Sequence, residues 1–489
     1  MDKGPLYIYN SISRKKEIFK SILPGRIGLY VCGPTVYSEV HLGNVRTFLS
    51  FDVIYRYLIF LGYKVRYVRN ITDVGHLVDD VDEGEDKIQK KARLENLEPM
   101  EVVQMYTNDF HNVMHHFNNL DPSIEPTATG HIMEQIEMIQ RILDKGFAYE
   151  VNGSVYFDVT KYDEKYDYGK LSGRKLDELM ANTRDLDGQS DKRNSADFAL
   201  WKNAEKEHLM QWNSPWGKGF PGWHLECSVM STKYLGETFD IHGGGMDLKF
   251  PHHECEIAQS TAADGIEPVK YWMHTNMLTV EGKKMSKSLG NGFTPKELLT
   301  GDHPLLEQGY SPMTVRFFML QSHYSSTLDF SNSALQAAEK GFARMMQLFD
   351  TLTSLKVSDQ NDFDFEKFET ECYTAMNDDF NTPILIAHLF DGGKFINSVK
   401  AGSKKIDKET KEKLVEFYRG LLFDVLGFLP MEEKGNKELI DFLMSTIIDV
   451  RNTAKKDKNF AQSDAIRDKL NELGITLKDS RTGTDWEIN

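Results

Sequence analysis

Cysteine is scarce in this chain, with 4 among 489 residues, and the four positions are widely spaced. A disulfide framework needs several closely spaced cysteines, so the sequence excludes a disulfide-rich secreted domain and fits a reducing compartment. The chain also lacks any apolar run of the roughly 20 residues that span a bilayer. Its N-terminus, "MDKGPLYIYNSISRKKEIF", lacks the apolar core of a secretory signal. We therefore expect a cytoplasmic protein without membrane contact, long enough to need several domains.

Basic residues are also in the minority, since 58 lysines and arginines face 74 aspartates and glutamates, for a net charge of −16. An acidic chain can still bind nucleic acid through a local basic face. Residues 1–70 carry such a bias, with 11 basic residues against 4 acidic ones. The acidic run "DDVDEGED" (79–86) is predicted to be a solvated loop rather than a metal site. Charge alone therefore excludes no nucleic-acid partner.

The first third of the chain has the pattern of a strand–helix–strand unit. "RIGLYVCGP" (26–34) predicts a buried strand and its exit turn, 44–63 has helical spacing with Gly62 as its stop, and 64–72 predicts a second strand. Such a unit forms a parallel sheet, and ligands bind at the carboxyl ends of its strands. The loop 32–44 is therefore the first place to look for chemistry. A second strand-and-turn pattern at 236–250 predicts the other half of the same sheet, after an insertion.

Beyond about residue 330 the pattern is helical. "FNTPILIAHLF" predicts a helix with Asn381 or Thr382 as its N-cap and Pro383 in its first position. The polar stretches "SDQNDFD" (358–364) and "MEEKGNKE" (431–438) are predicted to be linkers.

"PHHECE" (251–256) places potential metal ligands close together. On a helix His252 and Glu256 share a face, whereas His253 is expected to point away from both. Two ligands do not make a structural zinc site, but Cys32 and Cys227, each just beyond an apolar segment, could complete a set of two sulfurs, one nitrogen and one oxygen. Taken alone, the His-x-x-x-Glu spacing fits an ordinary surface histidine better than a metal ligand.

Two other groups bear on this metal hypothesis. Cys255 lies three residues from His252 and could compete for a metal. A histidine cluster at His111, His115 and His116 has helical spacing but no cysteine or carboxylate nearby in the sequence, so we expect it on the surface.

Two loops have the composition of phosphate-binding segments. In "HLGN" (41–44) a helix N-terminus follows a strand, Gly43 permits close backbone approach and His41 can donate to phosphate oxygens. "VEGKKMSKSLGN" (280–291) is a cationic loop that precedes a capping box at Thr294 and Glu297. Either motif alone is weak evidence for nucleotide binding.

In this order, "HLGN" and "KMSKS" resemble the paired signature of the class I aminoacyl-tRNA synthetases. The chain resembles the cysteinyl-tRNA synthetases from residue 6 to 486, in "YVCGPTVY", "YVRNITD", "DIHGGGMDLKFPHHE", "KMSKSLGN", "DDFNTP" and "SDAIRDKLNELGITLKDSRTGTDW". The resemblance implies an α/β fold, with a Rossmann-type parallel-sheet catalytic domain, an inserted connective region, a helical bundle and a small C-terminal anticodon-binding domain. The expected segments are catalytic 1–125, connective 126–220, catalytic with the zinc site 221–275, lysine loop and stem contact 276–330, bundle 331–430 and anticodon-binding 431–489.

The resemblance also implies the chemistry. One Zn²⁺ per chain is expected to bind the substrate thiolate and reject serine without an editing site, because a borderline-soft cation takes a neutral hydroxyl poorly. Its expected ligands are Cys32, Cys227, His252 and Glu256. Catalysis of adenylate formation from ATP with Mg²⁺ is assigned to His41, Asn44, Lys284 and Lys287, with Gly43, His41 and Lys287 also binding ATP.

The same resemblance assigns the remaining contacts. The amino acid pocket is expected to contain Thr72, Trp223 and Asp247, with Asp247 facing the α-ammonium group and Trp223 equally compatible with a core position. Contacts to tRNA are assigned to Asp464, Arg467 and Trp486, although Trp486 could instead close a small core. The expected partners are ATP, L-cysteine and tRNA(Cys), and the expected state is a monomer.

One departure from the family pattern is an acidic insertion at 74–85, whose role the sequence does not indicate. Two other functions remain open: a ligase that joins cysteine to an amino sugar, and a noncatalytic binding paralogue. The tail "GITLKDSRTGTDW" favours tRNA over the amino sugar, and the intact "KMSKS" loop favours catalysis.

Overall fold

The computed structural model describes residues 3–74, 86–181, 191–206, 208–285, 291–430, 434–473, 475–479 and 484–488. The chain forms two compact units, Met1–Leu429 and Pro430–Asn489. The acidic insertion lies outside the described residues except for Val74. In the described ranges no helix combines the length and apolar character that crossing a bilayer requires.

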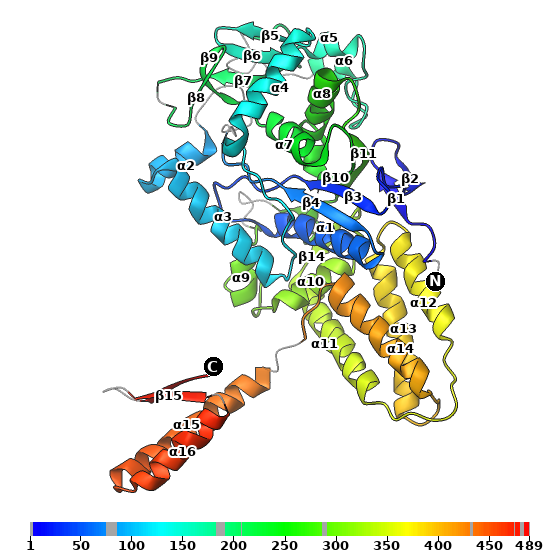
Figure 1. Ribbon diagram of the computed structural model, residues 1–489, viewed down its shortest axis with the longest axis vertical. Helices are drawn as coiled ribbons and strands as arrows, with labels where there is room; N and C mark the ends of the chain where they lie inside the picture. The colour runs from blue at the N-terminus through cyan, green and yellow to red at the C-terminus, as the bar shows by residue number, and fades with distance from the viewer. Residues whose placement is uncertain are drawn as a thin grey trace. The chain divides into compact units, whose positions relative to one another are not determined.

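A four-stranded parallel sheet in the order β11-β10-β3-β4 forms the centre of the first unit (Figure 1). Leu29 is paired with Tyr67 on one side and Ile241 on the other, and all three side chains are buried. The predicted parallel sheet, with its two halves separated by an insertion, is confirmed. Its strands are β3 (Arg26–Val31), β4 (Lys64–Arg69), β10 (Phe239–Gly245) and β11 (Val269–Thr275).

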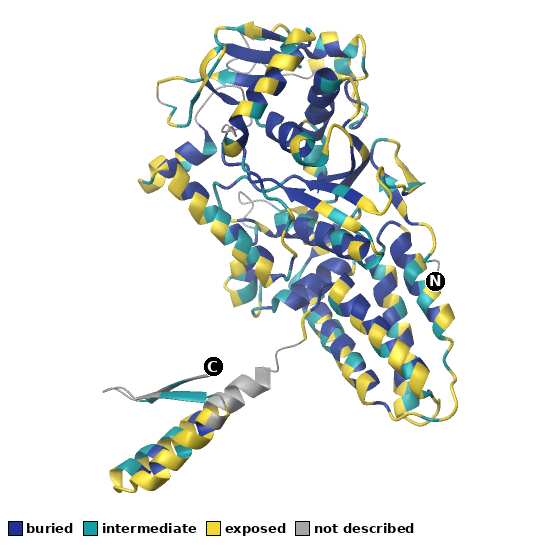
Figure 2. Cartoon of the chain, in the orientation of Figure 1, coloured by how far each residue is buried: buried dark blue, intermediate teal, exposed yellow. Residues whose placement is uncertain are grey.

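Helices cover both faces of this sheet, with α1 on one face and α7 and α8 on the other (Figure 1). α1 is followed by Gly62, whose φ of +97° is a conformation that glycine adopts without steric cost, as the sequence predicted for the helix stop. Every residue of α8 from His252 to Ala263 is buried, so this helix has no solvent-facing side (Figure 2). The helices are α1 (Leu42–Phe60), α7 (Leu225–Leu235) and α8 (His252–Asp264).

The insertion between the two halves contains an antiparallel sheet in the order β5-β6-β7-β9-β8. Its core is separate from that of the parallel sheet and includes Phe157, Leu200 and Trp201. The elements between β4 and β10 are α2 (Lys87–Glu95), α3 (Pro99–His116), η2 (Thr129–His131), α4 (Ile132–Asp144), β5 (Ala148–Val151), β6 (Ser154–Phe157), α5 (Val159–Asp163), α6 (Leu176–Ala181), β7 (Phe198–Asn203), β8 (Trp212–Ser214) and β9 (Gly217–Pro221). The buried hydrophobic residues of α2 and α3 belong to the core of the parallel sheet.

A small sheet and a helical bundle follow the parallel sheet. Asn381 caps α13 with its side chain and Pro383 lies in the first turn, as predicted. The elements are η4 (Met246–Lys249), β12 (Leu278–Val280), β13 (Lys283–Lys284), α9 (Pro295–Thr300), α10 (Pro312–Leu320), β14 (Leu328–Phe330), α11 (Asn332–Ser354), α12 (Phe365–Asn377), α13 (Thr382–Lys400), α14 (Lys408–Arg419) and η6 (Gly420–Val425); an N-terminal hairpin of β1 (Tyr7–Asn10) and β2 (Lys15–Ile18) completes the unit.

The second unit consists of two helices and a hairpin. These are α15 (Lys434–Lys456), α16 (Phe460–Glu472), β15 (Ile475–Asp479) and β16 (Thr484–Ile488). The predicted linker 431–438 is wrong for its second part, because α15 begins at Lys434. Lysine and glutamate are good helix formers, and a polar composition alone did not distinguish a first helical turn from a linker.

One buried carboxylate joins α1 to the bundle. Asp52 Oδ2 accepts hydrogen bonds from Arg56 Nε at 2.8 Å and from Arg316 Nη2 at 2.5 Å. Arg316 on α10 also donates to the backbone oxygens of Phe117 and Leu426, each at 2.7 Å. Asp52 is 2% exposed and Arg316 is fully buried, so removal of the carboxylate leaves two arginines without their charge partner.

We predict that Asp52→Ala lowers the free energy of unfolding by about 3–5 kcal/mol, the range for removing one partner of a buried ion pair. The matched control is Asp391→Ala, which breaks the exposed pair with Lys394 and should change that energy by no more than about 0.5 kcal/mol. Urea denaturation followed by tryptophan fluorescence measures both. Equal midpoints for the two variants would contradict the role assigned to Asp52.

Candidate active site

A cavity of about 560 Å³ lies at the carboxyl ends of β3, β4 and β10. Its walls come from the segments that follow these strands and from the first turns of α1, α7 and α8. This is where open parallel sheets bind ligands. The loop 32–44, which the sequence identified first, forms much of one wall, and the residues most relevant below are Cys32, His41, Asn44, Thr72, Trp223, Glu226, Cys227, Asp247 and His252.

The four predicted metal ligands converge at the base of this cavity. Cys32 follows β3, Cys227 lies on α7, and His252 and Glu256 lie one turn apart on α8. Their donor atoms all lie within 4.8 Å of one another, and all four side chains are buried. The two Sγ atoms are 3.7 Å apart, and zinc–sulfur bonds of about 2.3 Å in a tetrahedron place two sulfurs about 3.8 Å apart. The donor set therefore fits a tetrahedral metal ion.

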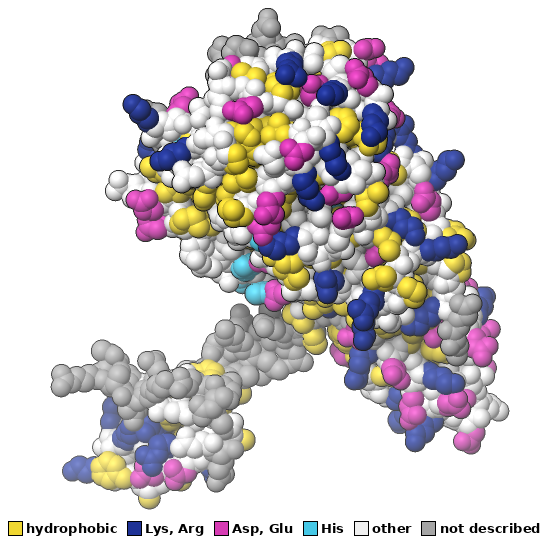
Figure 3. All heavy atoms as spheres, turned by 45° about the horizontal axis from the view of Figure 1, so that its top comes forward, with side chains coloured by type: hydrophobic (Ala, Val, Ile, Leu, Met, Phe, Trp, Pro, Cys, Tyr) yellow, Lys and Arg dark blue, Asp and Glu magenta, His cyan; other side chains and the backbone are white. Residues whose placement is uncertain are grey.

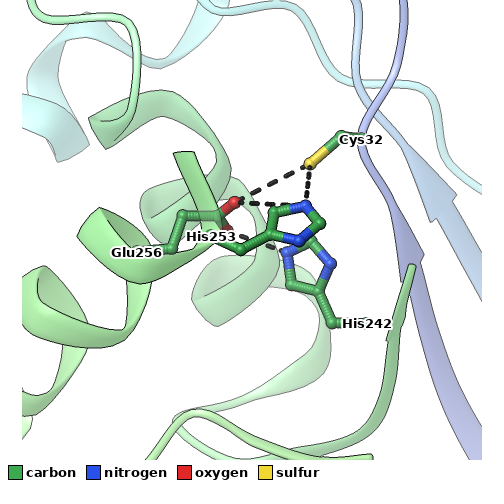
Figure 4. A group of neighbouring side chains, drawn as sticks. All are labelled: Cys32, His242, His253 and Glu256. Carbon is green, nitrogen blue, oxygen red and sulfur yellow. Dashed lines mark hydrogen bonds and ion pairs between the residues drawn. The ribbon is translucent and has the colours of Figure 1, made fainter. Parts of the chain in front are cut away.

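A second group of donors shares two of these residues (Figure 4). Cys32, His242, His253 and Glu256 also lie within 4.8 Å of one another. His253 Nε2 is 3.3 Å from Cys32 Sγ, so the prediction that His253 points away from the cluster is wrong. A helical-face argument assumes that one face is exposed, and α8 is buried on all sides.

The two groups differ in their access to the cavity. Cys32, Cys227 and His252 line it, whereas His242 and His253 are not among the described lining residues. Glu256 connects the groups, because its Oε1 lies 3.3 Å from His252 Nε2 while its Oε2 is held by His242 Nε2 at 2.8 Å. The group with two cysteines therefore lines the cavity with three of its four residues, whereas the other group lines it with Cys32 alone. His242 contacts the shared Glu256 on the side away from His252.

The titration of these groups follows from their burial. Burial raises the pKa of the Cys227 thiol to about 12, and burial together with Cys227 raises the pKa of Cys32 well above its ordinary value. Burial and the neighbouring histidines lower the pKa of His253 well below its ordinary value. Burial likewise lowers the pKa of His274 to about 3. Without a cation both thiols keep their protons at neutral pH, and His253 and His274 are uncharged.

The other sulfur and histidine candidates lie elsewhere. The Cys255 thiol is buried 3.6 Å from the hydroxyl of Tyr168 and belongs to neither donor group. His115 is exposed and His111 partly exposed, and their rings contact the carboxylates of Asp121 and Glu125 respectively. These carboxylates come from a following loop, which the local sequence around the histidines did not reveal.

The segment 41–44 lines the cavity with its first and last residues, and the described residues that flank 286–290 of the lysine loop lie beside it. His41 and Asn44 form a reciprocal cap on α1: Asn44 N donates to His41 Nδ1 at 3.3 Å and His41 N donates to Asn44 Oδ1 at 3.2 Å. Leu42 N donates to the backbone oxygen of Phe293 at 3.1 Å, just after the lysine loop.

Gly43, in the first turn of α1, also lies close to Met285, the last described residue before 286–290 of the lysine loop. A Cβ atom at Gly43 would lie 3.5 Å from Met285 of the lysine loop and 3.0 Å from His41. Lys284 is exposed, and its backbone oxygen accepts from Asn291 Nδ2 at 3.2 Å. Lys287 lies outside the described residues.

The three residues predicted for the amino acid pocket differ in solvent exposure. Thr72 is buried, Trp223 is partly exposed with its ring centroid 4.6 Å from that of His252, and Asp247 is exposed. Glu226, which the sequence reasoning missed, accepts a hydrogen bond from Thr72 and is 2% exposed. Burial raises the pKa of Glu226 well above its ordinary value, opposed by the hydrogen bond from Thr72. The available signal was that Glu226, next to Cys227, is the single acidic residue of α7.

The predicted tRNA-binding residues lie in the second unit. Asp464 and Arg467 are exposed on α16 and form an ion pair at 3.2 Å. Trp486 is partly exposed on β16, opposite Leu477 of β15. On the face drawn in Figure 3, basic and acidic side chains are interspersed over the described surface of each unit. Surface charge on this face therefore does not by itself mark a nucleic-acid site.

Comparison with known proteins identifies the family. The model of the "tRNA synthetases class I (C) catalytic domain" matches residues 18–340, and that of the "DALR domain" matches residues 371–430. The chain is 57% identical over 488 residues to a cysteine–tRNA ligase of Bacteroides fragilis, covering 99% of each chain. It is 49% identical over 491 residues to the cysteine–tRNA ligase of Chlorobaculum tepidum, covering 98% of each.

A solved structure shares the fold at much lower identity. Mycobacterium tuberculosis methionyl-tRNA synthetase in complex with methionyl-adenylate matches with a TM-score of 0.56 at 13% identity, over 82% of this chain and 89% of that one. The fold class and the resemblance seen in the sequence are thus confirmed. The chain belongs to the cysteine–tRNA ligases, a family of class I aminoacyl-tRNA synthetases.

Proposed function

We propose that this chain activates L-cysteine with ATP to cysteinyl-adenylate, releasing pyrophosphate, and transfers cysteine to the 3′ end of tRNA(Cys). The observation that carries the proposal is a buried set of two thiols, an imidazole and a carboxylate beside a cavity that is also lined by His41 and Asn44. Full-length similarity to cysteine–tRNA ligases supports the same substrates.

The donor set fits one Zn²⁺ held by Cys32, Cys227, His252 and Glu256. Two sulfur donors favour zinc over Mg²⁺ or Ca²⁺, which prefer oxygen ligands. When bound, the ion supplies a site that takes the substrate sulfur as thiolate and a serine hydroxyl poorly. Because the discrimination lies in binding, the proposal includes no editing site.

The protein contributes position and charge to adenylate formation. The carboxylate of cysteine attacks the α-phosphate of ATP and pyrophosphate leaves, so negative charge shifts onto phosphate oxygens. His41 and the backbone at Gly43 lie at the N-terminus of α1, which favours anions. Lys284 and Lys287 bring positive charge from the lysine loop, Asn44 fixes the orientation of His41, and Mg²⁺ accompanies the phosphates.

The other assignments follow from the same function. Thr72, Trp223 and Asp247 contact the amino acid or the adenylate, and Asp464, Arg467 and Trp486 contact tRNA. The hairpin of β15 and β16 contains the tail that favours tRNA over an amino sugar. The six-segment division of the chain and its monomeric state are part of this proposal.

The reaction is tested by ATP–pyrophosphate exchange with purified protein of known zinc content. We expect exchange with cysteine, and a rate with serine lower by more than the roughly 100-fold that shape alone provides. Comparable exchange with both amino acids would contradict discrimination by a thiolate-binding ion. No exchange with cysteine in protein that contains one zinc per chain would contradict the activation step itself.

The four cysteines form a matched series for the metal site, since all four are free and buried. Cys32→Ser and Cys227→Ser should reduce bound zinc from about one per chain to near zero, because each removes a thiolate ligand. Cys255→Ser and Cys372→Ser should keep it. Mass spectrometry of dialysed protein measures the content, and full zinc retention in Cys227→Ser would refute the ligand assignment.

A further inference from the structure

Glu226 is a buried carboxyl group in which one of the two oxygens makes no hydrogen bond within the described part of the chain. It lies in the first turn of α7 beside Cys227, is 2% exposed and lines the cavity. One oxygen, Oε1, accepts from the hydroxyl of Thr72. The other, Oε2, is buried and makes no hydrogen bond within the described part of the chain. A buried carboxyl oxygen without a partner is costly, so a ligand's donor is expected there.

The neighbouring hydrogen bonds determine whether a ligand next to Glu226 must donate or accept a hydrogen bond. Asn70 Oδ1 accepts from Gly33 N at 2.8 Å, which sets the orientation of the Asn70 amide. Asn70 Nδ2 then donates to Thr72 Oγ1 at 3.1 Å. Because the single hydroxyl hydrogen of Thr72 is directed to Glu226, Thr72 offers only a lone pair to a further partner. Thr72 Oγ1 and Glu226 Oε2 together form a pair of acceptors.

The charges around Glu226 indicate a cationic partner. Among the ionisable groups close enough to act on it are two acids, Asp73 and Glu256, and the thiols of Cys32 and Cys227. Asp73 is already engaged with the backbone N–H of Thr129 at 2.8 Å and with its hydroxyl at 2.5 Å. With Asp73 bonded to Thr129 and Glu256 assigned to the metal, a positively charged donor of the substrate remains as the partner for Glu226 Oε2.

We propose that Glu226, assisted by Thr72, binds the α-ammonium group of the substrate amino acid. The inference rests on the proposed function. In cysteine only two carbon atoms separate sulfur from nitrogen, so a sulfur held near Cys227 places the ammonium among the adjacent side chains. The contact between Cys227 Sγ and Asn70 Oδ1, at 3.6 Å, connects the metal donors to this acceptor pair.

This proposal replaces the expected role of Asp247 in ammonium binding. Asp247 lines the same cavity but is exposed. An ion pair with an exposed carboxylate is screened by water and contributes little, whereas a charge-assisted hydrogen bond to a buried carboxylate is strong. Glu226 is also the carboxylate adjacent in sequence to a proposed metal ligand.

The test compares L-cysteine with 3-mercaptopropionate, which has the same thiol and carboxylate but no amino group. Isothermal titration of zinc-loaded full-length protein gives a Kd for each compound and therefore a preference ratio. Glu226→Gln keeps the shape and the acceptor for Thr72 but removes the charge. We expect the ratio to fall by roughly 10- to 100-fold, the range for a charge-assisted hydrogen bond, mainly through weaker binding of cysteine.

The matched control is Asp391→Asn, which neutralises an exposed carboxylate of α13 that does not line the cavity, and its ratio should stay within about threefold of the original. Asp247→Asn tests the other carboxylate of the cavity, and a reduced ratio there together with an unchanged ratio in Glu226→Gln would assign the ammonium group to Asp247 and overturn the proposal. An unchanged ratio in Glu226→Gln overturns the proposal, whether or not both compounds bind more weakly. If that variant does not fold, Thr72→Val, which removes the second acceptor, decides: a reduced ratio supports the proposal and an unchanged one overturns it. Zinc-loaded wild-type protein that binds neither compound would instead refute the proposed function.

Discussion

Two buried residues of α1 hold the catalytic unit together: Asp52 through ion pairs and Arg46 through hydrogen bonds. Asp52 binds Arg56 and Arg316 and so joins α1 to α10 and to the end of the bundle. One and a half turns earlier Arg46, 1% exposed, donates to the backbone oxygens of Asn276 and Met277 at 3.1 and 2.6 Å. Those residues lead from the parallel sheet into β12 and the lysine loop. The position of the segment before β12 relative to α1 therefore depends on a charged side chain buried on that helix.

Buried charged groups of this kind determine the relative orientation of the elements more than they increase the free energy of unfolding. Removing two charges from water costs free energy that their attraction only partly returns, and apolar residues of similar volume would often be as stable. Apolar contacts, however, do not specify direction, whereas a guanidinium that donates to four backbone oxygens allows one register only. Arg46 makes such contacts, the remaining two being to His323 and Ser326. Precise placement matters here because phosphoryl chemistry depends mainly on position and charge.

The sequence was informative where local rules decide the structure. Short apolar runs and a glycine after the helix predicted the β3–α1–β4 unit, and Asn381 with Pro383 predicted the start of α13. His252 and Glu256 were identified as a pair because four residues make one helical turn. The two cysteines that join them come from the residue after β3 and from α7, and their proximity to α8 was only a hypothesis until the fold was known.

Sequence reasoning failed where tertiary packing determines the environment of a side chain. His253 was expected to point away from the site, but α8 is enclosed by the sheet and by the insertion, so each of its faces meets other side chains. His242 lies in a strand whose residues are all buried, and nothing in "DIHGGG" distinguishes a ligand, a supporting residue and a core histidine. Glu226 was missed because an acidic residue near a cysteine is common, and only burial makes it costly.

The acids and thiols at the base of the cavity have a common explanation. Cys32, Cys227, Glu226 and Glu256 are all nearly inaccessible to water, and each is an anion or becomes one on losing a proton. A protein interior holds such a group in charged form only when cations accompany it. The proposed metal ion would satisfy the thiols and Glu256, whereas Glu226 Oε2 makes no hydrogen bond in the described part of the chain. A substrate with a soft anionic sulfur at one end and an ammonium group two carbons away supplies what both parts of this cavity lack.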